Sequence, residues 1–188
     1  GSREIAERWA ARDARVRVVT HAEFLDQDAN YNRALGYMAP ASRYCKIVQA
    51  DDRILPGCLT GLVALGEAHP TAGIIGGCFL AGDVLAGGGL PFDRDFFTGR
   101  EACRTRLLRG GTYFGSPTCL LYRAEVVRER PEFYRANETN ADTTACFEIL
   151  EHWDFARLPQ IVCWLRRDGG SVSARLHVLG TAALLNYA

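Results

Sequence analysis

Two adjacent aspartates that follow an apolar segment most constrain what this chain can fold into. Residues 44–48 have the pattern of a buried strand, Asp51 and Asp52 follow closely, and Pro56 is typical of the first turn of a helix. A strand that ends in paired carboxylates places them at the rim of a sheet, where open α/β folds bind their ligands. Two carboxylates held together favour a positive partner, usually a divalent cation bound to a phosphate. In the alternative interpretation, one of the two aspartates only caps the next helix in a solvated turn.

The apolar segments alternate in an order that predicts an α/β protein. Helical spacing covers residues 3–12, 28–38, 56–67, 99–108, 123–131 and 144–152, and strand patterns cover residues 15–20, 44–48, 72–80 and 158–165. Asp28 is the expected N-cap of the second helix. Strands that alternate with helices across short connections are typical of a mostly parallel sheet with helices on both faces. The 188 residues suit one domain, with a loop-rich, glycine-containing insert at residues 81–98.

The composition argues against several classes of protein. Lys and Arg total 22 and Asp and Glu total 22, so there is no basic excess that would point to nucleic acid. The 7 cysteines include no C-x-x-C pair, which predicts buried, reduced thiols instead of a disulfide framework or a zinc site. No apolar segment approaches the roughly 18 residues of a membrane span. We expect a cytoplasmic protein that can also contact the inner face of the membrane through its apolar C-terminal residues.

Several motifs surround the Asp pair in a specific order. Asn32-Arg33-Ala34-Leu35 precedes it, and Gly115-Ser116-Pro117, Ala141-Asp142-Thr143 and Arg166-Arg167-x-x-x-Ser171 follow. This order, from about residue 3 to about residue 173, resembles the family 2 glycosyltransferases, a group of inverting, nucleotide-sugar-dependent enzymes with the GT-A fold. The resemblance implies a truncated GT-A (Rossmann-like) domain over residues 1–175 and a separate C-terminal helix over residues 176–188.

The resemblance also implies a donor site around the Asp pair. The family's Asp-Ala-Asp-Asp signature falls on residues 49–52, so Gln49 and Asp51 would contact the donor. Asp51 and Asp52 would hold Mg²⁺ or Mn²⁺ against its two phosphates. The metal would neutralise the charge that develops on the departing nucleoside diphosphate. Arg33 aligns with an arginine that is often near the nucleotide, with a surface or salt-bridge role as the alternative.

Further roles follow from the later motifs. The family's general base falls on Asp142, which would take the proton of an acceptor hydroxyl as that oxygen attacks the anomeric carbon opposite the diphosphate. N-capping of the helix at 144–152 is the alternative. Gly115 and Ser116 would line the acceptor site, unless they form an ordinary strand bend. Asp168, at a place where the family often has histidine, would be a further metal ligand, and Arg167 a weaker contact.

The implied function is an inverting glycosyltransferase of the hexosyltransferase type. It would move a sugar from a nucleotide-diphosphate sugar to a hydroxyl of a glycan or lipid-linked acceptor, in polysaccharide or glycoconjugate biosynthesis. Gln49 and Ala141 depart from the family's carboxylates, and the strand–helix–strand that binds the nucleobase has no counterpart in this sequence. We therefore expect weak or absent catalysis from this polypeptide alone. A degenerate sugar- or nucleotide-binding module and a metal-dependent nucleotidyltransferase remain as alternatives.

Overall fold

The structure is a computed structural model, and it describes residues 1–136, 138 and 140–167. The helices are α1 (Ser2–Ala10), α2 (Gln27–Leu35), α3 (Cys58–Ala68), α4 (Gly99–Arg109), α5 (Ala124–Arg128) and α6 (Ala141–Leu150), with a 3-10 turn, η1, at Pro117–Cys119. The strands are β1 (Tyr44–Cys45), β2 (Arg53–Ile54), β3 (Ala72–Ala81), β4 (Val84–Ala86), β5 (Phe96–Phe97), β6 (Leu120–Arg123) and β7 (Asp154–Leu165). The helix predicted at residues 176–188 lies outside the described residues.

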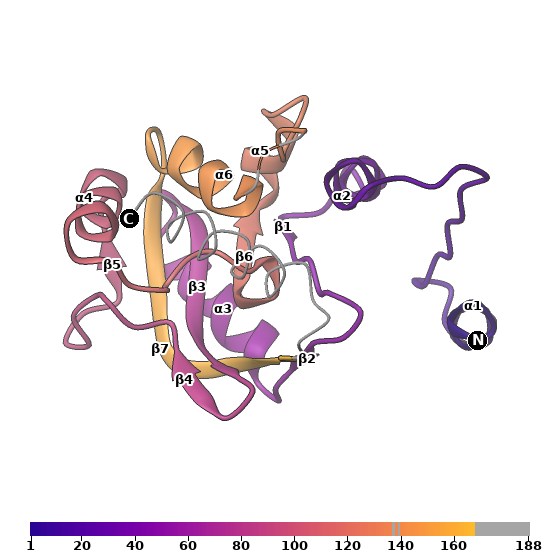
Figure 1. Cartoon of the computed structure of the whole chain (residues 1–188), viewed down its shortest axis with the longest axis horizontal. Coiled ribbons are helices and arrows are strands. Elements are labelled where there is room, and N and C mark those ends of the chain that lie inside the picture. Colours follow the sequence, from indigo (N-terminus) through magenta and orange to yellow (C-terminus); the bar gives the residue numbers. More distant parts are fainter. Residues whose placement is uncertain (137, 139, 168–188) are drawn as a thin grey trace, which may run out of the picture.

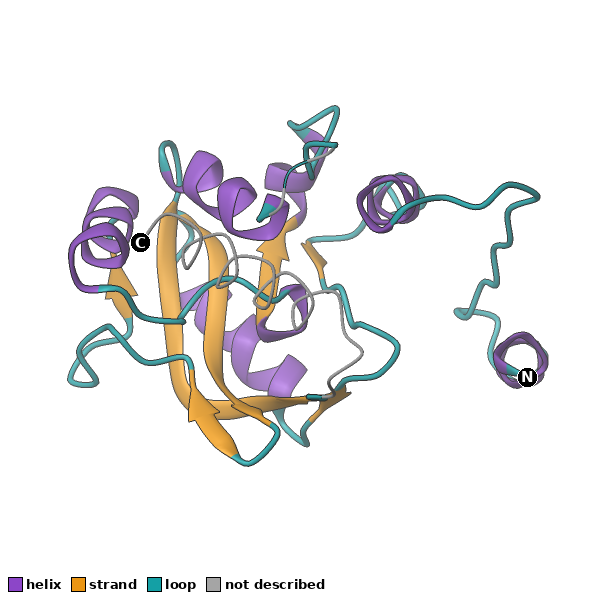
Figure 2. Ribbon diagram, viewed as in Figure 1, coloured by secondary structure: helices purple, strands orange, loops and turns teal. Residues whose placement is uncertain are grey.

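The sheet is mixed, so the prediction of a mostly parallel sheet is wrong. β3 and β7 run parallel at its centre, from Ala72 beside Asp154 to Ala81 beside Leu165 (Figure 1). Every other pairing in the described sheet is antiparallel: β1 with β6, β6 with β3, β3 with β4, β7 with β2 and β7 with β5. The order β1-β6-β3-β7-β2 gives a curled sheet with its two longest strands in the middle (Figure 2). The insert contributes two of the antiparallel strands, β4 and β5.

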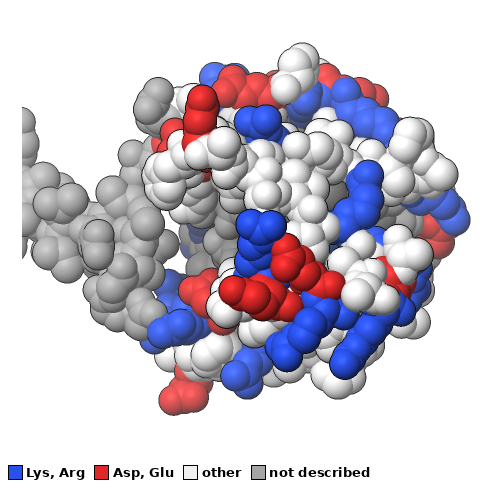
Figure 3. All heavy atoms as spheres, turned by 90° about the vertical axis from the view of Figure 1, so that its right-hand side faces the viewer, with Lys and Arg blue, Asp and Glu red and all other residues white. Residues whose placement is uncertain are grey.

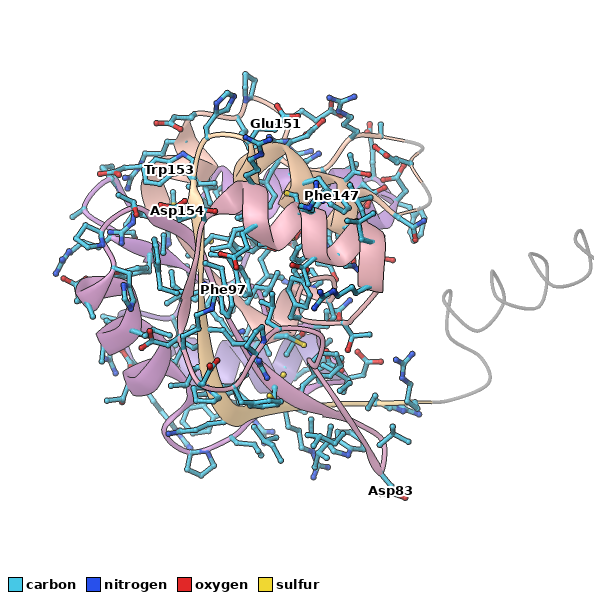
Figure 4. All side chains as sticks on the ribbon, turned by 90° about the vertical axis from the view of Figure 1, so that its left-hand side faces the viewer. Asp83, Phe97, Phe147, Glu151, Trp153 and Asp154 are labelled. Carbon is cyan, nitrogen blue, oxygen red and sulfur yellow. The ribbon has the colours of Figure 1, made fainter. Side chains whose placement is uncertain are left out.

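Helices cover both faces of the sheet, as the sequence predicted. Figure 4 shows β7 nearly edge-on, with α3 on one side and α4 and α6 on the other. Leu62 of α3, Ile74 of β3 and Phe155 of β7 are fully buried. On the α6 side, the rings of Phe114 and Phe147 pack edge-to-face with their centroids 5.2 Å apart. This core fixes β3 and β7, the strands that position the site described below.

The segment between α1 and α2 is a loop, so the predicted strand at residues 15–20 is wrong. Val16 and Val19 are exposed, and no ladder joins residues 15–20 to another described strand. Alternation of polar and apolar residues favours a strand only where a neighbouring edge satisfies the backbone groups. α1 buries none of its residues, and Figure 1 shows it standing away from the sheet.

The strand predicted before the Asp pair is shorter than expected. β1 pairs with β6 over only its two residues, Tyr44 and Cys45. Beyond them the Lys46 ammonium donates to the carbonyl oxygens of Thr118 and Leu120, so side-chain bonds replace the ladder. The chain then turns within residues 49–52 before β2 pairs with β7. The Asp pair therefore lies in a turn between two short edge strands, not at the end of a buried parallel strand.

The starts of two helices change the role that was predicted for an aspartate. Asp26, not Asp28, is the N-cap of α2, because its Oδ1 accepts the N–H of Ala29 at 2.8 Å. α6 begins at Ala141, three residues before the predicted start, so Asp142 lies inside its first turn.

Gly99 marks a close approach between α4 and the turn that joins α6 to β7. A methyl group at Gly99 would lie 2.1 Å from the Leu150 carbonyl oxygen and 2.2 Å from that of Trp153. Gly99→Ala should lower the free energy of unfolding by about 1–3 kcal/mol, as overpacking does, which urea denaturation would measure. Gly88→Ala is the control, because a methyl group there meets nothing within 4 Å. Similar losses in both variants would contradict this account.

Candidate functional site

A cavity of about 520 Å³ lies beside the carboxyl ends of β3 and β7, where Phe79 and Leu165 form part of its wall. Its other lining residues are Gln27, Tyr31, Gln49, Ala50, Asp51, Asp52, Arg106, Thr112, Phe114, Gly115, Ser116, Asp142, Arg166 and Arg167. A larger hollow, of about 650 Å³, is lined only by residues between Gly1 and Ala11, so it is the open side of α1. The first cavity is the candidate functional site.

The structure brings most of the predicted site residues together in this cavity. Gln49, Asp51 and Asp52 come from the turn between β1 and β2, Gly115 and Ser116 from the segment before η1, and Asp142 from α6. Their separation in the sequence is large, so the fold alone makes them neighbours. Their individual roles remain predictions, and Asp168 lies outside the described residues.

Asp52 is held by hydrogen bonds from two distant segments. Its Oδ2 accepts the Thr118 hydroxyl at 2.6 Å, and its Oδ1 accepts the Arg166 backbone N–H at 3.1 Å. Thr118 is fully buried in η1, and its hydroxyl oxygen also accepts the N–H of Gln49 at 3.1 Å. Asp52, Thr118 and Arg166, here called the Asp52 cluster, therefore tie the turn at 49–52 to η1 and to the end of β7.

Asp51 has the opposite environment. Its side chain is exposed on the cavity wall, and the described part of the chain gives it no hydrogen bond or ion pair. Mg²⁺ is commonly bound by one or two carboxylates together with substrate phosphates, and Asp51 fits the first of these ligands. Asp52 also fits, because a carboxylate offers about four lone-pair sites and two of them are used. No three His, Cys, Asp or Glu side chains in residues 1–136, 138 and 140–167 are grouped to hold a metal without a substrate.

Gln49 connects two walls of the cavity. Its Nε2 donates to the Tyr31 hydroxyl at 3.1 Å, and its Oε1 accepts the Ser116 hydroxyl at 3.0 Å. The amide therefore joins α2 to the segment before η1. The predicted contact of Gln49 with the donor would have to form while its amide keeps the hydrogen bonds to Tyr31 and Ser116.

Replacing Gln49 tests this structural connection. Gln49→Ala should lower the free energy of unfolding by about 1–3 kcal/mol, because it leaves two partly buried hydroxyls without their partner. Gln49→Glu should lose much less, because a carboxylate accepts from both hydroxyls. Urea denaturation distinguishes the two variants, and equal losses would show that the bonds to Tyr31 and Ser116 contribute nothing.

Asp142 lies in the first turn of α6, and the alternative that it caps this helix is wrong, because the N-cap is Asn140. The half-buried carboxylate accepts the N–H of Thr143 at 2.7 Å and lines the same cavity as Asp51. Burial, followed by the charges of nearby carboxylates that include Asp142, raises the pKa of Asp28. Asp142 thus stands at the cavity with another carboxyl group within electrostatic reach.

Gly115 and Ser116 form a bend that leads into η1. Gly115 has φ 149°, and a methyl group on it would meet only the Thr143 Oγ1, at 3.9 Å. The space above Gly115 is therefore open to the cavity. Ser116 is occupied by its bond to Gln49. The backbone of Gly115 and Ser116 thus forms a bend, as the alternative interpretation of the sequence proposed. Contact of these residues with an acceptor remains a prediction.

Arg33 lies outside the cavity. α2 faces the cavity with Gln27 and Tyr31, which are one helical turn apart, whereas Arg33 is exposed and is not among the lining residues. The position of Arg33 agrees with the alternative interpretation, in which this arginine has a surface role.

Sequence reasoning missed four polar side chains of the cavity, those of Gln27, Tyr31, Arg106 and Thr112. Gln27 and Tyr31 had a usable signal, since their spacing places them on one face of a helix. Arg106 of α4 lies over the ring of Phe114, with 5.7 Å between its guanidinium carbon and the ring centroid. It belongs to no motif, so only the fold reveals it. Arg167, predicted as a weaker contact, lines the cavity.

The surface carries charges of both signs. Figure 3 shows basic and acidic side chains interspersed on the face that carries the N-terminal segment. None of the helices in the described ranges has the length and apolar character required to cross a membrane.

Comparisons with known proteins bear on the fold and the family of this chain. A search of curated proteins finds no match. Among solved structures, S. aureus TarS, residues 1–349, superposes with a TM-score of 0.64 at 14% identity, over 87% of this chain and 47% of that one. The same protein in complex with UDP-GlcNAc gives a TM-score of 0.67 at 16% identity, over 90% and 47%. The chain thus spans about half the length of these structures, and such identities show a common fold. The family model described as Glycosyl transferase family 2 matches residues 1–130, more than half of the 188 residues, so this chain belongs to glycosyl transferase family 2.

Proposed function

We propose that this chain supplies the diphosphate-binding wall and the general base of an inverting, nucleotide-sugar-dependent glycosyltransferase. The observation that carries the proposal is the shared cavity, in which Asp51, Asp52 and Asp142 meet although they come from distant segments. Family membership supports the reaction class. The complex of S. aureus TarS with UDP-GlcNAc supports a uridine-diphosphate sugar as the first donor to test.

In this proposal the pair Asp51 and Asp52 has a different role from Asp142. Asp51 and Asp52 would hold Mg²⁺ or Mn²⁺, and the bound metal would neutralise charge on the departing nucleoside diphosphate. Asp142 would accept the proton of the acceptor hydroxyl, which makes that oxygen a better nucleophile. Attack on the face opposite the diphosphate inverts the anomeric carbon.

The acceptor and the cellular site are proposals of the same kind. A glycan or lipid-linked hydroxyl compound would enter beside Gly115, where the cavity wall has no side chain. The corresponding process is the synthesis of a polysaccharide or glycoconjugate at the cytoplasmic face of a membrane.

A non-catalytic sugar- or nucleotide-binding module is the second candidate. The observation that favours it is the environment of Gln49, whose amide is used to join Tyr31 and Ser116 at the place of a family carboxylate. Such a module would bind a nucleotide sugar without a contribution from Asp142.

Donor binding gives the direct test. We expect UDP-GlcNAc to raise the melting temperature of the protein in the presence of Mn²⁺ and to raise it much less in the presence of EDTA, because binding to the native state stabilises it. Isothermal calorimetry with UDP-GlcNAc, UDP-glucose and UDP then ranks the donors. No melting shift with any nucleotide sugar, with or without Mn²⁺, would reject both candidates.

A further inference from the structure

We propose that Cys119 and Cys163 form a thiol–disulfide modification site beneath the Asp52 cluster, with a peroxide as the oxidant. Their sulfurs lie 3.6 Å apart, and both side chains are buried. No other two cysteine sulfurs among the described residues are in hydrogen-bonding contact. A disulfide requires sulfurs about 2.05 Å apart, so the two side chains must approach by roughly 1.5 Å.

The two cysteines lie in the two segments that hold Asp52. Cys119 follows Thr118, whose hydroxyl donates to Asp52, and Cys163 lies in β7 shortly before Arg166, whose N–H donates to the other carboxylate oxygen. A covalent bond between the sulfurs would therefore draw η1 and the end of β7 toward each other. At least one of the two hydrogen bonds to Asp52 would then change its length or direction.

Lys46 supplies a positive charge beside the pair. Its ammonium donates to the carbonyl oxygens of Thr118 and Leu120, the residues on either side of Cys119. The hydrogen bond with Cys119, together with the attraction of Lys46, lowers the pKa of Cys163 against the opposing effect of burial. The same contact, with burial, raises the pKa of Cys119. Thiolates are the form that reacts, so the ammonium of Lys46 favours oxidation at this pair of sulfurs.

The oxidation balances with hydrogen peroxide as the co-reactant. The Cys163 thiolate attacks one oxygen of the peroxide, which gives a sulfenic acid and releases hydroxide. The Cys119 sulfur then attacks the sulfenic sulfur, the S–S bond forms, and its thiol proton leaves with the hydroxyl group as water. In total, two thiols are oxidised and one peroxide is reduced to two waters. Because both thiols are buried, we expect the reaction to be slow and to require local opening of the end of β7.

The consequence for ligand binding rests on the proposed function. If the Asp52 cluster supports the metal and the diphosphate, the oxidised chain should bind UDP-GlcNAc with Mn²⁺ about tenfold more weakly or worse. That factor corresponds to the loss of one hydrogen bond to a charged group.

The experiment treats the fully reduced chain with hydrogen peroxide under native conditions and maps the peptides by mass spectrometry. We expect the loss of two hydrogen atoms, one cross-link between the Cys119 and Cys163 peptides, and its reversal by dithiothreitol. Cys119→Ser and Cys163→Ser should each abolish the cross-link. Cys45→Ser is the matched control, because Cys45 is a half-buried thiol without a sulfur partner, and this variant should keep the cross-link.

Other outcomes overturn the proposal. Oxidation of Cys163 to an acid without a cross-link, or cross-links spread among other cysteines, would show that the contact is only packing. Melting curves show whether the serine variants fold. If either serine variant does not fold, Cys163→Ala is used in its place to test for loss of the cross-link. Donor binding by the reduced chain is measured in parallel. A cross-link without donor binding leaves the modification site standing and rejects the proposed function, and donor binding without a cross-link does the reverse.

Discussion

Asp142→Asn is expected to lower turnover by roughly 10²–10⁴-fold while leaving the affinity for the nucleotide sugar unchanged. Asparagine has the same shape, and its amide oxygen can still accept the N–H of Thr143, so the first turn of α6 should persist. What it lacks is the ability to take a proton from the acceptor hydroxyl. The loss should therefore fall on turnover and not on donor binding, which steady-state kinetics and calorimetry measure separately.

The matched control for Asp142 is Asp28→Asn. Asp28 is a neighbouring carboxyl that interacts electrostatically with Asp142 but does not line the cavity. This variant should keep turnover within a few-fold of the unchanged protein. Full activity of Asp142→Asn, or an equal loss in both variants, would mean that another group is the base.

Asp51→Asn is expected to weaken Mn²⁺-dependent binding of UDP-GlcNAc by roughly 100-fold or more, because the loss of a direct metal ligand should cost at least as much as the loss of an outer-shell partner, about 10–100-fold. Its stability should be unchanged, because Asp51 is exposed and has no partner in the described chain. Asp52→Asn should differ. It should lose affinity and also about 1.5–3 kcal/mol of unfolding free energy, because the hydrogen bonds from Thr118 and Arg166 lose their charged acceptor.

Asp83→Asn is the control for both Asp variants. Asp83 is an exposed carboxylate at the turn between β3 and β4, which Figure 4 shows at the lower edge of the molecule. Calorimetric titration with Mn²⁺ and UDP-GlcNAc, together with urea denaturation, gives the two measurements for each variant. Mn²⁺ dependence that survives in Asp51→Asn would remove the metal role from this residue.

The sequence predicted the long elements better than the sheet. The apolar pattern at 72–80 and the helical spacing at 99–108 correspond closely to β3 and α4, because both periods extend over several turns or pleats. Three of the five antiparallel pairings depend on β1, β2 and β5, which have two residues each, and so short a strand has no readable period. Residues 15–20 show the converse, since a clear alternation formed no strand where no edge was available.

The sequence predicted which residues form the site but not how they are hydrogen-bonded to one another. Motif order indicated Asp51, Asp52 and Asp142, and the fold places all three at one cavity. The difference between the two aspartates could not be read from the sequence. It depends on Thr118 and Arg166, whose bonds to Asp52 span 66 and 114 residues. Only the fold shows which of two adjacent carboxylates is fixed and which is free.

That span of 114 residues has a consequence for how the protein is made. The turn at 49–52 leaves the ribosome long before the end of β7, so Asp52 has only part of its hydrogen bonding until nearly all the described chain is available. Contacts this distant in the sequence form late, because the chain entropy of closing the loop must be overcome first. The central pairing of β3 with β7 also needs residues up to Leu165, so a nascent chain would complete its core and its ligand site at nearly the same chain length. Nucleotide sugar added during synthesis should stabilise only chains that extend beyond Arg166.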